Sequence, residues 1–200
     1  MVSRHEYKKQ QILLAAGQLF AEHGYRVSMD AIAKAANVSK QTVYAHFGTK
    51  DALFETCIQS KCITYRITEN EFNYELSLQQ MLVEFGMRFQ SLLLEEGVKQ
   101  TYRNAISQLE SHPDLASMYL ESGPKNTITT LSHYLSEKLA RESLNLGIDM
   151  EDAAMQLLLL FHGRAVYFAN LGEDSQESDE QREKYIRSCV ELFLRGNGLL

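Results

Sequence analysis

Proline is scarce in this sequence, with two residues among 200. Because proline interrupts both helices and sheets, this scarcity favours long uninterrupted helices. Hydrophobic residues at 44% and charged residues at 23% are ordinary for a globular protein. The chain is long enough to bury a core, either as one domain or as a small domain fused to a larger one. We therefore expect an all-α protein.

The sequence also lacks any stretch that resembles a secretion signal or a membrane span. Its start, MVSRHEYKKQQ, is charged and polar, and the apolar ILLAA that follows is too short for the core of a signal peptide. The most apolar segment, MQLLLLFHGRAVYF, contains Gln156, His162 and Arg164, whereas a span needs about 20 apolar residues. We expect a cytoplasmic protein with no membrane partner.

Cysteine is limited to three residues, Cys57, Cys62 and Cys189, which form no Cys-x-x-Cys pair. An odd number of cysteines in a reducing compartment is typical of free thiols. We expect free thiols here, with redox sensing as the alternative.

Motifs of the common enzyme classes are missing as well. The sequence contains no G-x-S-x-G, no G-x-x-x-x-G-K-[ST] and no H-E-x-x-H. No Glu lies three residues before any of the six histidines, which excludes the Glu-x-x-His pairs of di-iron helical bundles. We expect no enzymatic activity, no metal site and no cofactor.

Charge is distributed unevenly along the chain. Residues 1–50 hold seven of the 20 Lys and Arg and three of the 26 Asp and Glu, a net charge of +4. The remaining 150 residues hold 13 basic and 23 acidic residues, a net charge of −10. This division predicts that the N-terminal part, and not the rest, contacts a polyanion.

The N-terminal part has the pattern of short helices joined by tight turns. A first helix is predicted from about residue 6 to residue 23, with Gly24 as the left-handed residue that ends it. Its apolar face carries Ile12, Ala16, Leu19 and Phe20.

A second helix of about two turns is predicted after Ser28, which is placed to cap it. Its apolar residues are Met29, Ile32, Ala33 and Ala36. Asn37 accepts a positive φ readily, and Ser39 is placed as the next N-cap, so only about three residues separate this helix from a third one. Two helices joined so closely cross steeply, which is the helix-turn-helix geometry.

Residues 39–47 place different side chains on the two sides of the third helix. Val43 and Phe47 point towards the preceding helices, whereas Gln41 and Ala45 lie opposite. Such a helix fits the major groove of B-DNA, so we expect its first turn to read base edges and Ala45 to meet a thymine methyl. The first-turn candidates are Lys40, Gln41 and Thr42.

Phosphate contacts are predicted at the rim of this helix and at the start of the next. Tyr44 and His46 are placed to hydrogen-bond phosphates, which fixes register without reading sequence. Thr49 is a predicted N-cap with Lys50 in the first turn behind it, so a phosphate could meet the ammonium and free backbone N–H groups together. The alternative for all these residues is an ordinary solvated surface helix.

Residues 8–56 resemble the TetR family of transcriptional regulators. The resemblance is carried by ILLAAGQLFAEHGY and by SMDAIAKAANVSKQTVYAHFGTKDALF. Its most specific part is Tyr44, His46, Phe47 and Lys50. Asn37 departs from the glycine usual in the family, and Asp30 would repel a phosphate, so we expect the contact near the second helix to come from Ser28 instead.

The resemblance implies a DNA-binding domain over residues 1–54, with the helix-turn-helix at about 28–47, and a helical ligand-binding and dimerisation domain over 55–200. The segments TYRNAISQLESHPDLASMYLESGP and DAAMQLLLLFHGRAVYFANLG look like one C-terminal type within the family. Pro113 suits the first position of a helix, and Gly123-Pro124 a break between helices. The predicted helices of this part are 51–70, 78–95, 98–111, 113–121, 124–145, 150–171 and 181–195.

A homodimer built on the last two long helices, about 150–171 and 181–195, is also implied. Residues 153–168 are apolar around most of the helix circumference, which a helix packed on one side only would not require. A two-fold dimer reads a palindrome whose half-sites lie about 34–36 Å apart or slightly more.

The family further implies a small-molecule ligand in each C-terminal bundle. Candidates are aromatic or ionisable residues on helices that should face inward, each of which could instead fill the core or form surface and interface pairs. They are Phe85, Phe89, Arg103, Tyr119, His162 and Tyr167.

The function that the sequence predicts is a homodimeric transcriptional repressor that binds double-stranded operator DNA and is released by a small-molecule inducer. The alternative is a helical adaptor that uses its basic N-terminal part to bind an acidic protein without DNA. DNA binding that weakens log-linearly with salt would distinguish the regulator from the adaptor.

Overall fold

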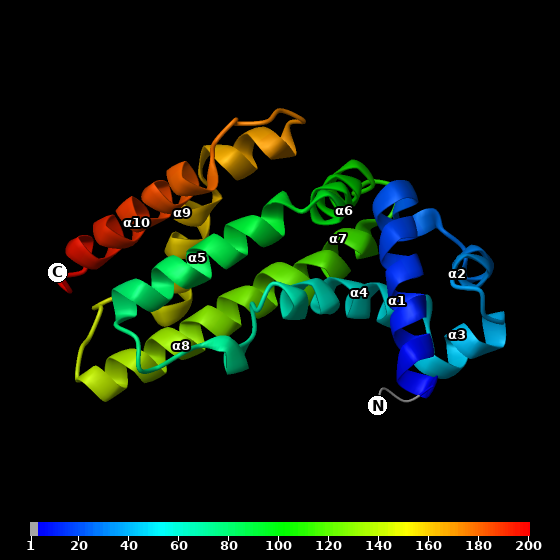
Figure 1. Ribbon diagram of the computed structural model, residues 1–200, viewed down its shortest axis with the longest axis horizontal. Coiled ribbons are helices and arrows are strands. Elements are labelled where there is room, and N and C mark those ends of the chain that lie inside the picture. The colour runs from blue at the N-terminus through cyan, green and yellow to red at the C-terminus, as the bar shows by residue number, and fades with distance from the viewer. Residues whose placement is uncertain (1–3) are drawn as a thin grey trace. The chain divides into compact units, whose positions relative to one another are not determined.

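The computed structural model describes residues 4–200, and these residues form helices and short connections without any β-strand (Figure 1). The all-α prediction is therefore confirmed. None of the described helices is both long enough and apolar enough to cross a membrane.

The chain divides into two compact units, each made of two separate stretches of sequence. The first unit comprises Met1–Lys61 and Glu96–Gly123, and the second comprises Cys62–Glu95 and Pro124–Leu200. The sequence predicted a single boundary at residue 54. The observed division differs because two later helices pack with the N-terminal ones. These are α6 (Glu96–Ser107) and α7 (Pro113–Leu120), of which α6 packs against α1 (Arg4–His23).

The first unit continues from α1 through α2 (Met29–Ala35), α3 (Lys40–Phe47) and α4 (Lys50–Thr64), with a 3-10 turn at Gly24–Arg26. Its core joins the apolar faces predicted for the first three helices with residues of α4 and α7. Ile12, Ile32, Val43 and Leu53 are completely buried, and Leu115 of α7 belongs to the same cluster. The core of the helix-turn-helix is thus completed by a residue that lies far away in the sequence.

A polar contact fastens α6 to the end of α1. Asn104 donates from Nδ2 to the carbonyls of Phe20, at 3.3 Å, and Ala21, at 2.8 Å. The last four carbonyls of a helix lack partners within the helix, so this side chain satisfies groups in the last turn of α1. Gly24 follows with φ of 67°, as the left-handed end of α1 predicts.

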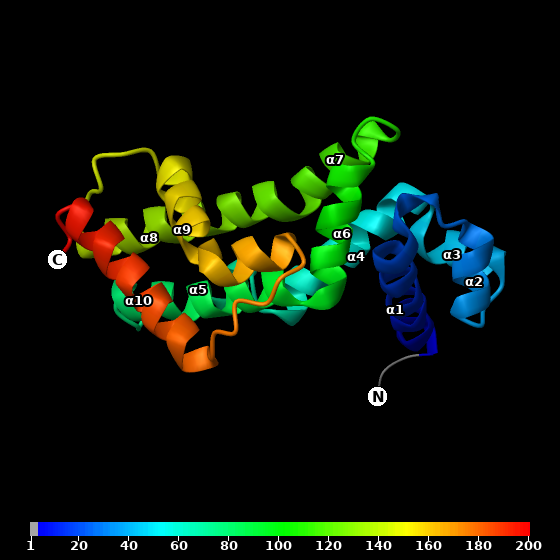
Figure 2. The same ribbon diagram turned by 90° about the horizontal axis from the view of Figure 1, so that it is seen from above.

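The second unit is built from four long helices: α5 (Leu78–Leu94), α8 (Asn126–Glu142), α9 (Met150–Asn170) and α10 (Asp179–Gly196). Helices α5, α9 and α10 pack against one another, and α8 packs on α9 (Figures 1 and 2). Ser77 and Ser178 begin α5 and α10 with complete capping boxes.

Several helix boundaries differ from the sequence prediction: the helix expected at 98–111 is Glu96–Ser107, and two further differences have a clear local cause. The helix expected to reach residue 70 ends at Thr64, because Arg66 takes a left-handed φ of 58° and Ile67 N–H bonds back to the Cys62 carbonyl. The break expected at Gly123-Pro124 is a π-helical turn at Glu121–Lys125 instead, which leads directly into α8.

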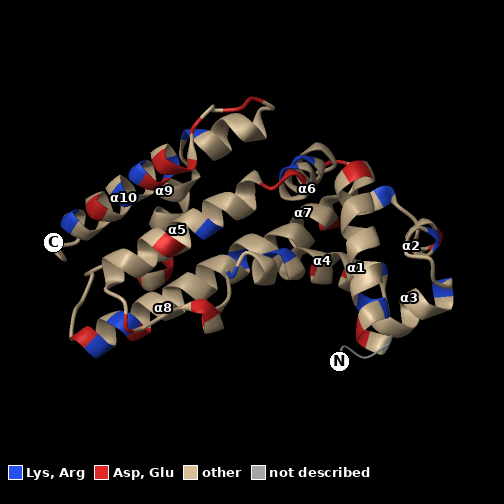
Figure 3. Ribbon diagram, viewed as in Figure 1, with Lys and Arg blue, Asp and Glu red and all other residues tan. Residues whose placement is uncertain are grey.

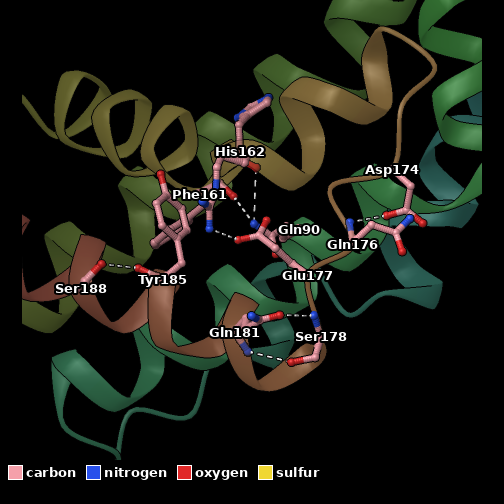
Figure 4. Close-up of polar contacts among 11 residues, drawn as sticks. Gln90, Phe161, His162, Asp174, Gln176, Glu177, Ser178, Gln181, Tyr185 and Ser188 are labelled. Atoms are coloured by element: carbon pink, nitrogen blue, oxygen red, sulfur yellow. Dashed lines mark hydrogen bonds and ion pairs between the residues drawn. The ribbon is translucent and has the colours of Figure 1, made fainter.

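Helix α9 is broken at Gly163, which has φ of 57° and ψ of −169°. The buried side chain of Gln90 donates from Nε2 to the carbonyls of Phe161, at 3.0 Å, and His162, at 3.3 Å (Figure 4). The hydroxyl of Tyr185 donates to the Leu160 carbonyl at 2.9 Å. Carbonyls that lose their helical partners at the break are therefore bonded by side chains of α5 and α10.

Candidate nucleic-acid interface

The turn between α2 and α3 has the predicted local geometry. Ser28 Oγ accepts a hydrogen bond from the Ala31 amide at 3.1 Å, and Ser39 Oγ accepts one from the Thr42 amide at 3.1 Å. Asn37 has φ of 50°. Both predicted N-caps and the predicted left-handed turn residue are confirmed, and together they define a helix-turn-helix.

Helix α3 presents a polar outer face. Val43 and Phe47 are buried, whereas Gln41 and Ala45 are exposed and Tyr44 is 43% exposed. The helix is thus held by one apolar side, and its first turn and opposite side are open to a groove of DNA.

Lys40 lies in an ion pair that the sequence did not predict. Its Nζ is 2.7 Å from Asp30 Oδ2, and both side chains are at least half exposed. The hydrogen bond to Asp30, and then its negative charge, raise the pKa of Lys40. Lys40 therefore stays protonated, but its charge is shared with a carboxylate at the start of α2.

The hydroxyl of Thr42 already has a hydrogen-bond partner in the first turn of α3. Its Oγ1 lies 2.8 Å from Ser39 Oγ, and the side chain is half-buried. Among the three first-turn candidates, Lys40 and Gln41 are exposed, and of these two Lys40 is paired with Asp30 of α2.

His46 faces α1, where His5 lies close to it. The two ring centroids are 4.3 Å apart, and the Nδ1 atom of His46 is shielded from solvent without a hydrogen-bond partner among the described residues. Burial lowers the pKa of His46, and the charges of His5, Lys8 and Lys9 lower it further. This favours a neutral ring, so any phosphate contact by His46 would be a hydrogen bond more than an ion pair.

Lys50 is positioned by Tyr25. Its ammonium donates to the Tyr25 carbonyl and lies 4.0 Å from the centroid of the Tyr25 ring, while the Tyr25 hydroxyl donates to Asp51. Burial lowers the pKa of Lys50. Thr49 Oγ1 accepts from the Ala52 amide at 3.1 Å, as predicted for an N-cap. The cation is therefore held at the start of α4 by a cation–π contact and a hydrogen bond.

Basic residues occur on all the helices around this surface, as Figure 3 shows for α1, α2 and α3. Helices α1 and α2 also carry acidic residues, as α10 does along its length, but Lys and Arg outnumber Asp and Glu over α1 to α3 together. The local excess of positive charge predicted from the sequence is thus present where α3 is exposed.

Comparison with known proteins identifies this arrangement. Residues 12–57 match the model of bacterial regulatory proteins of the tetR family, and residues 80–196 match that of the AefR-like transcriptional repressor C-terminal domain. The chain belongs to the TetR family. The predicted resemblance is confirmed over both parts of the sequence, and the family assignment makes the protein a DNA-binding transcriptional regulator and not an enzyme.

Relatives within the TetR family align over nearly the whole chain. The negative transcriptional regulator IcaR of the biofilm operon icaADBC, from Staphylococcus aureus, is 26% identical over 94% of this chain and 99% of its own. The structure of the flavonoid-responsive regulator FrrA is 32% identical, with a TM-score of 0.74 over 95% of this chain and 96% of its own. A TetR-family regulator from Mesorhizobium loti MAFF303099 is 25% identical, with a TM-score of 0.76 over 97% and 98% of the two chains.

The ligand candidates predicted from the TetR resemblance do not form one group. Phe85, Phe89 and His162 lie together in the second unit. The ring centroid of Phe89 is 6.1 Å from that of Phe85 and 5.8 Å from that of His162. Arg103 and Tyr119 belong to the first unit, on α6 and α7. Tyr167 was expected to face inward but is 65% exposed, because it lies on the outer side of α9 after the break at Gly163.

The three cysteines are free and buried, as expected for thiols without partners. Burial raises the pKa of Cys57 to about 12 and also raises the pKa values of Cys62 and Cys189. Thiolates, the reactive form, are therefore disfavoured at all three positions.

Proposed function

We propose that this TetR-family protein is a homodimeric repressor that binds a palindromic operator through α3 and leaves it when a small molecule binds. The observation that supports operator binding most directly is the outer face of α3, where Gln41, Tyr44 and Ala45 are exposed on a helix whose other side is fixed in a core. A helix presented in this way can enter the major groove without rearranging the fold.

Within this proposal the eight predicted DNA contacts keep separate roles. Gln41 reads base edges together with Lys40 and Thr42, and Ala45 meets a thymine methyl. The phosphates are held by Ser28, Tyr44, His46 and Lys50. Lys40 must share its charge between Asp30 and the DNA, which makes it a weaker reader than its position alone suggests.

Exposed apolar residues on α9 and α10 support the dimer. Large hydrophobic side chains remain exposed on these two helices, or directly after α9, in the single chain: Met155, Leu159, Tyr167, Phe168, Leu171 and Leu192. Single exposed apolar residues also occur on other helices of the chain, but a set gathered along two adjacent helices is typical of an interface. Burying this set against a second copy would place two copies of α3 in a two-fold arrangement.

Helix α4 supports the coupling between ligand and operator. Its first residues, to Lys61, belong to the first unit, and its last turn belongs to the second. A ligand that favours one position of this helix would favour one spacing of the two recognition helices. Coupling of about 1–3 kcal/mol changes operator affinity roughly 5–150-fold.

A repressor is the simplest regulator, because blocking transcription requires only that the operator is occupied. IcaR is a negative transcriptional regulator, and the C-terminal family is that of AefR-like transcriptional repressors, which agrees with this direction of control.

The test is selection of bound sequences from random duplex DNA by the purified full-length protein. The variant Lys40→Ala/Gln41→Ala/Thr42→Ala should lose the selected sequence. A matched control replaces a Lys, an Asn and a Thr at exposed positions of the second unit, as Lys125→Ala/Asn126→Ala/Thr129→Ala. We expect an inverted repeat from the wild type and the control and none from the α3 variant.

Equal selection by all three proteins would show that α3 does not read the operator. If none of them selected a sequence, salt titration on random DNA would follow, because a DNA-binding protein loses affinity log-linearly with salt. Absence of that dependence would exclude the regulator and favour an adaptor that binds an acidic protein.

A further inference from the structure

An open cleft lies in the second unit, between the end of α4 and one face of α5. Its volume is about 300 Å³, and it is lined by Thr64, Tyr65, Arg66, Met87, Arg88 and Ser91. None of the six ligand candidates chosen from the sequence is among these residues. Thr64 ends α4 and Arg66 is the left-handed residue after it, while the other wall comes from successive turns of α5.

Arg88 has an unusual environment in this cleft. Its Nε and Nη2 atoms are shielded from solvent and have no hydrogen-bond partner within residues 4–200. A shielded charged donor without a partner destabilises a protein, so such groups are normally paired. The unpaired nitrogens are Nε and Nη2, whose N–H bonds lie parallel on one edge of the guanidinium plane. This edge is the fork that binds both oxygens of a carboxylate.

The charges around Arg88 also favour an anion. Burial lowers its pKa, and the positive charge of Arg66 lowers it further, while Glu84 and Glu71 act in the opposite direction. The Nε of Arg66 is already bonded to Glu71 at 2.5 Å. Glu71 is thus engaged by the other arginine, and neither Glu71 nor Glu84 bonds the Nε and Nη2 edge of Arg88.

The rest of the lining indicates a ligand with an apolar body. Met87 and Tyr65 contribute a thioether and an aromatic ring, and Ser91 adds a hydroxyl. Ligand pockets have volumes of about 300–1,000 Å³, so this cleft suits a small molecule at the lower end of that range.

We propose that this cleft binds a small carboxylate with an apolar body, whose two oxygens are held by Nε and Nη2 of Arg88 when the side chain turns this shielded edge into the cleft. The regulatory meaning of the site rests on the proposed function, since binding at the last turn of α4 would supply the ligand response. Binding itself does not depend on DNA and is tested separately.

The first experiment is isothermal titration calorimetry on the full-length protein with benzoate, phenylacetate and hexanoate, and with the corresponding amides. At about 10 mM a ligand with a Kd of about 1 mM nearly saturates the protein. We expect at least one carboxylate to bind and its uncharged amide not to bind. Arg88→Met should lower the affinity for that carboxylate by about tenfold or more, because the substitution removes the two charge-assisted hydrogen bonds but keeps an apolar side chain.

Two further variants separate the fork from charge alone. Arg88→Lys keeps the cation but not the parallel donors, and should bind more weakly than wild type. Arg141→Met removes an exposed arginine of the same unit and should bind like wild type. Without ligand, Arg88→Met should raise the midpoint of thermal unfolding by about 2–4 °C, since it removes an unpaired shielded charge.

Three results would overturn the proposal. They are no binding by any of the carboxylates, equal binding by a carboxylate and its amide, and unchanged binding by Arg88→Met. Inorganic phosphate that binds through Arg88 more tightly than every carboxylate would also overturn it, because the ligand class would be wrong.

An operator assay completes the design. If a carboxylate binds through Arg88 and weakens operator binding, both the site and the ligand response are supported. If it binds but leaves operator affinity unchanged, the carboxylate site stands and ligand release through this cleft is contradicted.

Discussion

At the scale of single residues, the candidate interface depends on side chains that already have partners. Asp30 bonds Lys40, Tyr25 holds Lys50, and His5 packs on His46. The positions of these side chains on their helices could be predicted, because N-caps and helical periodicity depend on residues close in sequence. The partners were not predictable, because His5 and His46, or Tyr25 and Lys50, are far apart in sequence and meet only through tertiary packing.

Asp30→Asn tests the ion pair with Lys40. Removing the carboxylate frees the lysine charge for phosphate and removes a repulsion, so operator affinity should rise severalfold at low salt. The slope of log affinity against log salt should steepen by about one. Binding measured by fluorescence anisotropy across a salt series would show this. Asp174→Asn, an exposed carboxylate of the second unit, should change neither quantity.

Tyr44→Phe tests the proposed phosphate hydrogen bond. Loss of one such bond should weaken operator binding by about 1 kcal/mol, or about fivefold, while the salt slope stays unchanged because the hydroxyl is uncharged. The same anisotropy assay applies, with Tyr102→Phe in α6 as control. Unchanged operator affinity would remove Tyr44 from the set of DNA contacts.

At the scale of elements, helix ends were predicted well where a cap marks them. Ser28, Ser39, Thr49 and Pro113 each begin a helix at or next to the expected position. The break within α9 was not predicted, since a glycine in an apolar run gives no clear local signal of a chain break. It depends on Gln90 and Tyr185, which come from other helices.

Gly163→Ala tests that break. The residue has a left-handed φ, and a Cβ added there would lie 2.6 Å from Tyr185 Cε1. Backbone strain and displacement of Tyr185 should together destabilise the protein by about 2–4 kcal/mol, measured by urea unfolding. Gly172→Ala has φ of 90° but nothing within 4 Å of its added Cβ, so it should lose only about 1 kcal/mol. Equal losses would mean that the contact with Tyr185 contributes nothing.

At the scale of the whole molecule, fold class and family followed from the sequence, whereas the division into units did not. The bonds from Asn104 to Phe20 and Ala21 join residues more than 80 positions apart. No pattern of neighbouring residues predicts such a contact. The Arg88 cleft was missed for a similar reason, since neither Arg66 nor Arg88 stands in a motif.

Leu159→Lys tests the dimer. The side chain is 58% exposed in the single chain, so its replacement should leave the fold intact. A two-fold interface would receive two unpaired charges, which should weaken dimerisation by tenfold or more. Light scattering after size-exclusion chromatography should show a shift from dimer to monomer. Leu144→Lys, an exposed residue after α8, should remain dimeric, and a dimeric Leu159→Lys would place the interface elsewhere.

The split composition of the first unit determines when it can form during synthesis. The ribosome delivers α1 to α4 first, then α5, and only later the helices that carry Asn104 and Leu115. A nascent chain of 61 residues holds the whole helix-turn-helix but neither the group that bonds the last turn of α1 nor the last side chain of its core. The complete DNA-binding unit therefore exists only after Gly123 has left the exit tunnel, when more than half of the chain has been made.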